Sequence, residues 1–265
     1  MFSGLAPPRR RLLLAIIAVA VAAALVGIFV VVRNGATTAP APQDQPGPIL
    51  VIPGLGGSTG GLTVLAERLL GEGRDVTIMA LPGDGRGDLR EQAQALADEV
   101  TVALARTGAP SVDVVGYSAG GIVARIWVAD LGGDTLARRV ITLGSPHHGT
   151  QLASIAGDLA PAACAACTQL APDSEVLRQL NAGDETPDGP EYISIWTTLD
   201  ETVIPPDSAE LDGALAIPVQ SVCADSRVTH GQLPSDPLVV GIIVEGLGSD
   251  EPVELTTADC DRLSS

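Results

Sequence analysis

The chain has 265 residues, enough for one sizeable domain or at most two small ones. Its acidic residues begin at Asp44, and residues 44–265 carry 32 acidic side chains against 11 arginines, a formal charge of −21, with no lysine. Nucleic-acid binding depends on clustered basic side chains, so we expect no nucleic-acid partner. The same excess of acid predicts high solubility, low self-association and a monomer.

The amino terminus contains an uncharged apolar stretch, residues 12–32, which follows the arginines of residues 9–11. At about 1.5 Å per residue it would span roughly 31 Å, close to the hydrocarbon core of a bilayer at about 30 Å. The apolar region of a cleaved signal peptide is usually shorter, and Pro40 directly after Ala39 is unfavourable for cleavage. We therefore expect an uncleaved membrane anchor, with residues 1–11 in the cytoplasm and the acidic domain outside it. A removed signal peptide and a secreted protein are the alternative.

Residues 33–48 are rich in proline, alanine and polar side chains and predict a linker. From residue 49 to 265, short apolar strands alternate with helical segments, which predicts one α/β domain with a mainly parallel sheet covered on both faces. Asp88 is a plausible helix cap, and residues 149–190 form an insert that could be a lid or a buried helix pair. In chain order we expect a strand at 49–54, helix 62–73, strand 75–83, helix 88–108, strand 112–118, helix 119–131, strands 138–146, 191–199 and 217–223, and helix 236–247.

Four cysteines allow three disulfide pairings in an oxidising compartment. The C-A-A-C spacing favours Cys164–Cys167, which leaves Cys223–Cys260 as the second pair. A metal site would need a second nearby pair of Cys or His ligands, and a redox motif would need a thioredoxin-like context. We therefore interpret the cysteines as structural disulfides.

The sequence G-Y-S-A-G at residues 116–120 lies between a predicted strand and a predicted helix. A G-x-S-x-G motif at such a sharp turn presents the serine hydroxyl, and the flanking glycines avoid Cβ collisions in the turn. This placement makes Ser118 the candidate nucleophile.

A nucleophilic serine needs a general base and an acid that orients it, in the chain order Ser, acid, His for α/β-hydrolases. Of the three histidines, only His230 follows the last predicted strand; His147 and His148 come earlier and are interpreted as turn residues, or otherwise as contacts at the rim of the site. Asp200 is the first acid after the strand at 191–199, so it is the preferred third member. Other acids that remain open are Glu201, Asp207 and Asp225.

The oxyanion of an acyl-transfer intermediate needs two N–H donors. One candidate is the backbone amide of Ala119, directly after the nucleophile, and the other is that of Leu55 in the Gly-rich loop after the first strand, with Gly56 next. The loop lacks the G-K-[ST] of a P-loop and the spacing of a dinucleotide-binding turn. We therefore expect no nucleotide.

Five segments together resemble the small secreted bacterial lipases and esterases of the α/β-hydrolase fold. They are VIPGLGG (51–57), VVGYSAGG (114–121), VITLGSPHHGT (140–150), TTLDETVIPP (197–206) and VTHGQLPSDPLVV (228–240). The resemblance implies a cofactor-free hydrolase of carboxylic esters, usually glycerides or fatty-acyl esters, with Ser118, Asp200 and His230 as its triad. Two departures stand out: Pro53-Gly54 replaces the His-Gly that often precedes the oxyanion loop, and no clear acidic pair supports the calcium site of larger related lipases, so no metal is expected.

The sequence therefore predicts a serine hydrolase that cleaves a lipid or other ester through an acyl-enzyme. Two alternatives stay open. An acyltransferase would pass the same acyl group to an alcohol, and a non-catalytic, membrane-anchored binding module would tolerate the loss of any triad member.

Overall fold

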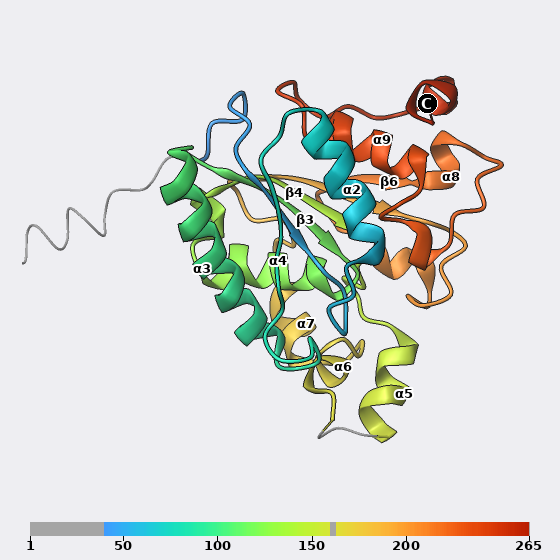
Figure 1. Cartoon of the computed structure of the whole chain (residues 1–265). Coiled ribbons are helices and arrows are strands. Elements are labelled where there is room, and N and C mark those ends of the chain that lie inside the picture. The colour runs from blue at the N-terminus through green and yellow to red at the C-terminus, as the bar shows by residue number, and fades with distance from the viewer. Residues whose placement is uncertain (1–39, 160–162, 265) are drawn as a thin grey trace, which may run out of the picture. The chain divides into compact units, whose positions relative to one another are not determined.

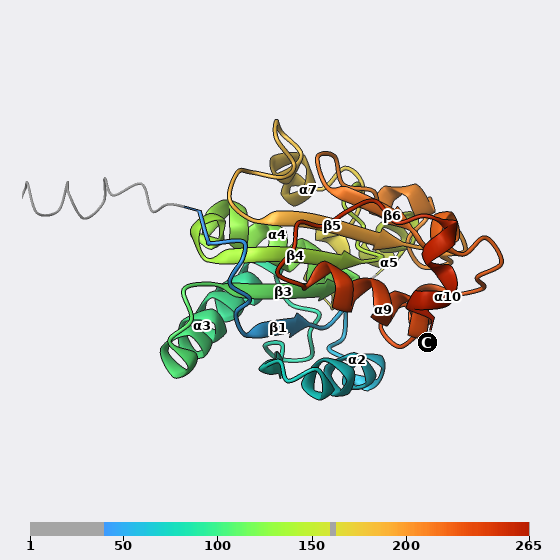
Figure 2. The same ribbon diagram turned by 90° about the horizontal axis from the view of Figure 1, so that it is seen from above.

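Six parallel strands form one sheet in the order β2-β1-β3-β4-β5-β6 (Figures 1 and 2). In this computed structural model, residues 40–159 and 163–264 are described. From β1 the chain adds β2 on one side of the sheet, and it then adds β3, β4, β5 and β6 in turn on the other side. The direction in which strands are added therefore reverses between β1 and β3. Ligand sites in open α/β sheets lie at the carboxyl ends of the strands at such a point. The strands are β1 Ile49–Ile52, β2 Val76–Ile78, β3 Val112–Tyr117, β4 Ala137–Leu143, β5 Glu191–Trp196 and β6 Leu215–Pro218.

Helices cover both faces of the sheet, and alternate strand residues supply the two cores. The arrangement of the helices about the sheet can be followed in Figure 1. Leu50 and Ile52 of β1 belong to the core shared with α3 and α4, whereas Ile49 and Val51 belong to the core shared with α2 and α9. This alternation follows from the two-residue period of a strand, and the continuous apolar runs are typical of a doubly covered parallel sheet. The helices around the sheet are α2 Gly60–Gly71, α3 Leu89–Thr107, α4 Ala119–Asp130, α8 Val219–Val222, α9 Pro237–Gly246 and α10 Cys260–Leu263, with 3-10 turns η1 Gly133–Thr135, η2 Pro206–Ala209, η3 His230–Gln232 and η4 Thr257–Asp259.

The predicted elements are present, but several strands are shorter than expected: β2 spans Val76–Ile78 of the predicted 75–83, and the last strand differs in type as well as length. The Asp88 carboxylate accepts a hydrogen bond from the Arg90 amide at 2.7 Å, so the predicted cap of α3 is confirmed. The strand expected over 217–223 instead ends at Pro218, and Val219–Val222 is helical. Proline suits the start of a helix because its φ is fixed and it has no N–H to donate, and the apolar side chains Val219 and Val222 are then buried on one face of the helical turn.

Residues 149–190 contain three short helices, α5 Gln151–Leu159, α6 Ala165–Gln169 and α7 Glu175–Leu180 (Figure 1). The amide of Ala166 donates to the carbonyl of Arg86 at 3.1 Å, which attaches α6 to the loop before α3. The Cys164–Cys167 disulfide closes the start of α6, and Cys223–Cys260 joins the segment after α8 to α10. Both predicted pairings are therefore present.

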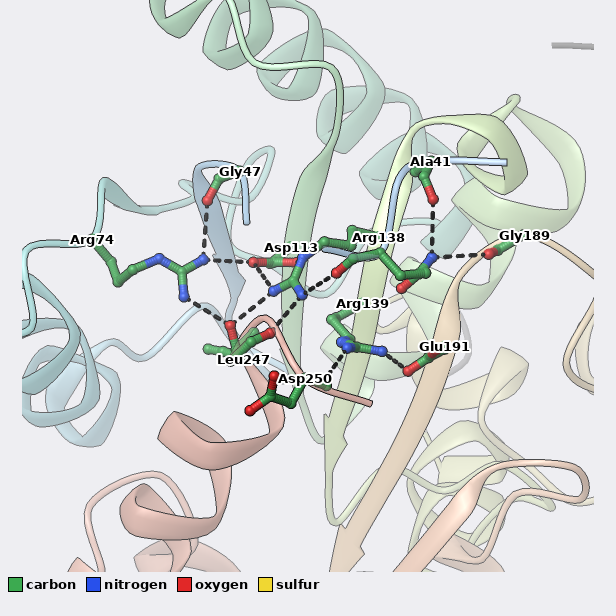
Figure 3. Close-up of polar contacts among 12 residues, drawn as sticks. Ala41, Gly47, Arg74, Asp113, Arg138, Arg139, Gly189, Glu191, Leu247 and Asp250 are labelled. Atoms are coloured by element: carbon green, nitrogen blue, oxygen red, sulfur yellow. Dashed lines mark hydrogen bonds and ion pairs between the residues drawn. The ribbon is translucent and has the colours of Figure 1, made fainter. Parts of the chain in front are cut away.

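A buried ion-pair network lies at the amino end of the sheet (Figure 3). Asp113 of β3 is fully buried and receives two hydrogen bonds of 2.8 Å from Arg138 and one of 2.6 Å from Arg74. The two arginines also donate to the carbonyl of Leu247, at the carboxyl end of α9, where cations are favoured. The pairing of β3 with β4 shifts register between Val112 and Asp113, and Arg138 is the residue of β4 that lies at this shift.

The same network holds the chain that precedes β1. Arg138 donates to the carbonyl of Gln43 at 3.0 Å, and Arg74 donates to that of Gly47 at 3.1 Å. Ala41, Gly47 and Pro48 are buried. The compact unit that holds the sheet accordingly begins at Pro40, before the predicted domain start at residue 49.

The predicted anchor at residues 12–32, residues 1–11 and the first part of the linker lie outside the described residues. Within residues 40–159 and 163–264, no helix combines the length and the apolar character needed to span a bilayer.

Candidate active site

The candidate nucleophile Ser118 lies between β3 and α4, where the order of the sheet reverses. Its φ of 53° and ψ of −122° make it the one non-glycine residue with positive φ among those the structure describes. A Cβ at Gly116 would lie 2.6 Å from Gly121 Cα, and one at Gly120 would lie 2.4 Å from the carbonyl oxygen of Ile52. The two glycines therefore allow β3, α4 and β1 to approach closely around a strained turn, as the motif predicts.

Ser118, His230 and Asp200 form a continuous chain of contacts. The Nε2 atom of His230 lies 3.1 Å from Ser118 Oγ, and its Nδ1 atom lies 2.7 Å from Asp200 Oδ2. The other oxygen of Asp200 accepts hydrogen bonds from the amides of Thr202 at 2.8 Å and Val203 at 2.7 Å. His230 and Asp200 are both buried, so their contact is shielded from water. This geometry is that of a nucleophile, a base and an orienting acid.

Other candidates from the sequence lie apart from this chain. Glu201, Asp207 and Asp225 are exposed, and in the described part of the chain none of them contacts His230. His148 is exposed and lies 3.0 Å from Glu185.

His147 and His148 both lie in a turn, as predicted, and the His147 side chain is fully buried. Its Nε2 atom lies 3.0 Å from Thr142 Oγ1, and burial holds the pKa of the imidazole well below its usual range. It therefore stays neutral at physiological pH. No contact between His147 and Ser118 occurs among the residues described.

The loops that carry the acid and the base are bound to each other. The hydroxyl of Thr197, at the end of β5, donates to the carbonyl of Val228 at 2.7 Å, two residues before His230. Gln220 of α8 donates to the same hydroxyl at 2.9 Å and accepts from the Thr198 amide at 2.9 Å. Because these side chains cross-link three segments, they hold the Asp200 and His230 loops at a fixed separation.

The expected oxyanion donors lie beside the nucleophile. A Cβ at Gly54 would be 3.0 Å from Ser118 Cβ, so the loop that carries Leu55 approaches the serine closely. Within the described ranges, the N–H groups of Leu55 and Ala119 donate to no protein acceptor. The alternative donor Gly56 instead gives its N–H to the carbonyl of Gly85 at 3.1 Å. The amides of Leu55 and Ala119 therefore remain the candidate oxyanion donors.

Residues 40–159 and 163–264 contain no group of three or more His, Cys, Asp or Glu side chains that could hold a metal ion.

Comparison with known families assigns the chain. The sequence model of the class 2 lipases matches residues 98–240, which is more than half of the chain and includes all three residues of the contact chain. The chain belongs to the class 2 lipase family. The predicted resemblance to lipases is thereby confirmed.

Solved structures of lipases share the fold of this class 2 lipase. Aspergillus fumigatus lipase B is 21% identical with a TM-score of 0.70, over 83% of this chain and 56% of that one. Bacillus licheniformis lipase BlEst2 is 21% identical with a TM-score of 0.64 in both forms. The alignment covers 82% of this chain and 54% of the propeptide form, and 77% of this chain and 93% of the mature form. The chain thus spans little more than half the length of two of these lipase chains, and the likeness shows the α/β-hydrolase fold.

Sequence reasoning did not single out Tyr117, which lies beside the candidate base. Its ring lies against the imidazole of His230, with 5.2 Å between ring centroids, and its hydroxyl donates to the His230 carbonyl at 3.3 Å. Burial, with the negative charges of Asp200 and Glu201, raises the pKa of Tyr117 to about 12. Tyr117 is the variable residue before the serine in G-x-S-x-G, so the motif itself carried no signal for its role.

Proposed function

We propose that the chain is a serine hydrolase of carboxylic esters that works through an acyl-enzyme. The observation that carries this proposal is the chain of contacts from Ser118 through His230 to Asp200, in a member of the class 2 lipases. No cofactor enters the reaction.

In the first half of the reaction, Ser118 Oγ attacks the ester carbonyl carbon while His230 Nε2 takes the hydroxyl proton. Asp200 accepts the Nδ1–H of the imidazole and so keeps Nε2 free as the proton acceptor, and its negative charge stabilises the imidazolium. The amides of Leu55 and Ala119 donate to the oxyanion. The intermediate collapses when His230 returns the proton to the alcohol oxygen, and the alcohol leaves.

In the second half, a water molecule takes the place of the alcohol. His230 Nε2 accepts one of its protons as the oxygen attacks the acyl carbon, and then returns that proton to Ser118 Oγ. The carboxylic acid is released and loses its proton to solvent.

The substrate class is a lipophilic ester, and exposed apolar side chains near the site support it. Leu55 is 41% exposed on the oxyanion loop, and Leu199, directly before the acid, is 40% exposed. In α5, Leu152 and Ile155 are also exposed, and this helix begins where the Gln151 amide donates to the carbonyl of Ile204 on the acid loop at 3.1 Å. Large exposed apolar side chains at a site are typical of surfaces that receive apolar ligands.

We further propose that the domain acts outside the cytoplasm, on an uncleaved anchor at residues 12–32 or secreted after its removal. The support is the apolar amino terminus of the sequence together with the two disulfides, which persist in oxidising compartments.

The test uses residues 40–265, wild type and Ser118→Ala, with a fluorophosphonate label and ester substrates from C2 to C16. Stoichiometric labelling and ester turnover by the wild type, both lost in Ser118→Ala, are expected. A folded wild-type protein that takes no label would contradict the serine-hydrolase proposal. Transfer of the acyl group to an added alcohol in preference to water would favour an acyltransferase, and activity on C2–C4 esters alone would favour an esterase over a lipase.

A further inference from the structure

Tyr117 connects three parts of the proposed site. It is the last residue of β3, directly before Ser118, and its ring centroid lies 5.2 Å from that of His230 with 36° between the ring planes. A Cβ at Gly54 would lie 3.3 Å from Tyr117 Cδ1, so the loop that carries Leu55 also packs against this ring. One aromatic side chain therefore contacts both this loop and the imidazole of His230.

The ring, more than the hydroxyl, carries this contact. At 3.3 Å the hydrogen bond from the hydroxyl to the His230 carbonyl is long for an O–H donor. Aromatic faces attract cations whose centres lie within about 6 Å of the ring centroid, and the imidazole becomes a cation each time it accepts a proton from serine or water. The raised pKa of Tyr117 means that its hydroxyl stays neutral, so the ring adds no competing negative charge.

Two carboxylates act on the charge around His230 and Tyr117. Asp200 is in direct contact with Nδ1, and the exposed Glu201 lies near enough to act on Tyr117. On the remaining side, a Cβ at Gly144 would lie 3.1 Å from His230 Nδ1, so the backbone of β4's end is in contact with the ring. The imidazole is thus held by a carboxylate at one edge, a backbone at another and the Tyr117 ring beside it.

We propose that the ring of Tyr117 is a positioning element for the catalytic base, which holds the His230 imidazole between Ser118 and Asp200 and stabilises its protonated form in the transition state. This inference rests on the proposed hydrolase function and adds a residue to it. Its role is indirect, because the ring acts on the substrate only through His230.

The test compares Tyr117→Phe, which keeps the ring, with Tyr117→Leu, which removes it. We expect Tyr117→Phe to stay within about threefold of the wild-type kcat, because only a long hydrogen bond is lost. Tyr117→Leu should lower kcat about tenfold with little change in KM, as expected for an interaction made with a charge in the transition state. The acidic limb of its kcat–pH profile should move about half a unit lower, because the imidazolium is less stable without the ring.

A second readout follows the imidazole directly. The chain has three histidines, and the ring current of Tyr117 acts on the Hε1 proton of His230. In the NMR spectrum that signal should be retained in Tyr117→Phe and shifted in Tyr117→Leu. Tyr192→Leu is the matched control: it removes the other tyrosine ring, which is buried in β5, and should lower stability without changing kcat per labelled site.

Rates are divided by the fluorophosphonate-labelled fraction, and Tyr117→Met supplies a second ring-free variant if Tyr117→Leu does not fold. A folded ring-free variant with wild-type kcat and an unmoved acidic limb would overturn the inference. Wild-type protein that takes no label would instead overturn the hydrolase proposal, while the NMR comparison would still report whether the ring holds His230.

Discussion

The substitution Asp200→Asn tests whether Asp200 orients the imidazole of His230 or only packs against it. The hydrogen bonds around Asp200 determine how the side-chain amide of an asparagine must lie. One carboxylate oxygen of Asp200 accepts from the amides of Thr202 and Val203, and the other accepts from His230 Nδ1. Asparagine has a single side-chain oxygen, and the two backbone donors require that it stay on their side. The amide NH2 group then faces Nδ1, which must become an acceptor.

This orientation places the imidazole proton on Nε2, where it faces Ser118 and prevents proton transfer from the hydroxyl. The reverse orientation leaves two backbone N–H groups without an acceptor, at about 1–3 kcal/mol each. The productive tautomer is therefore disfavoured by about 2–6 kcal/mol, and loss of the carboxylate charge beside the imidazolium costs about 2 kcal/mol more. A total of about 4–8 kcal/mol corresponds to a decrease in kcat of about 10³ to 10⁶-fold.

The assay is single-turnover acylation with a chromogenic ester, together with the rate of fluorophosphonate labelling, and both should fall in parallel. Glu201→Gln is the matched control, since it removes an adjacent exposed carboxylate that does not contact His230 in the described structure. It should stay within about twofold of wild type because exposed charges interact weakly. Folded Asp200→Asn with more than a tenth of wild-type kcat would refute the assignment of Asp200 as the orienting acid.

Three further predictions concern stability, measured by denaturant unfolding. The pKa of His147 is depressed in the native state, so below about pH 6.5 the unfolded chain binds a proton that the native chain does not. The free energy of unfolding should therefore fall as the pH decreases, by up to about 1.4 kcal/mol per pH unit. His147→Gln should lose this slope between pH 7.5 and 5.5, whereas the exposed His148→Gln should keep it, and equal slopes would contradict the reasoning. Asp113→Asn should lower the free energy of unfolding by about 3–5 kcal/mol, because it leaves buried guanidinium groups without a carboxylate. The kcat per labelled site should not change, because the proposed triad lies at the other end of the sheet. A cost under 1 kcal/mol would show that the network is dispensable. Replacing both Cys223 and Cys260 by serine should lower the free energy of unfolding by about 4 kcal/mol, because the disulfide joins residues that are 37 positions apart in the chain. An unchanged denaturation midpoint would contradict this prediction.

The sequence by itself determined the fold class and, within the proposed triad, Ser118 and His230. Alternating strands and helices are local patterns, and each is written in hydrophobic periodicity and in caps such as Asp88. Ser118 could be located because its motif sits at a strand–helix junction, and His230 because so few histidines were available. The acid was expected on a loop just after a strand, between Ser118 and His230 in the chain, and Asp200 was preferred there, with Glu201, Asp207 or another acid such as Asp225 left open.

Only the tertiary structure decided contacts that depend on how loops return to the sheet. It brings Asp200, in preference to Glu201 or Asp207, to His230, because Thr197 and Gln220 bind the acid and base loops together. Such contacts join residues far apart in sequence, and no local pattern records them.

The amino-terminal segment and Tyr117 illustrate the same limit. Residues 41–48 have the composition of a linker, yet carbonyls within them accept hydrogen bonds from two arginines buried around Asp113. Tyr117 occupies a variable position of its motif and has a partner 113 residues away. Composition and periodicity describe neighbours along the chain, whereas these roles come from neighbours in space, and those are set only when the whole sheet and its loops have folded.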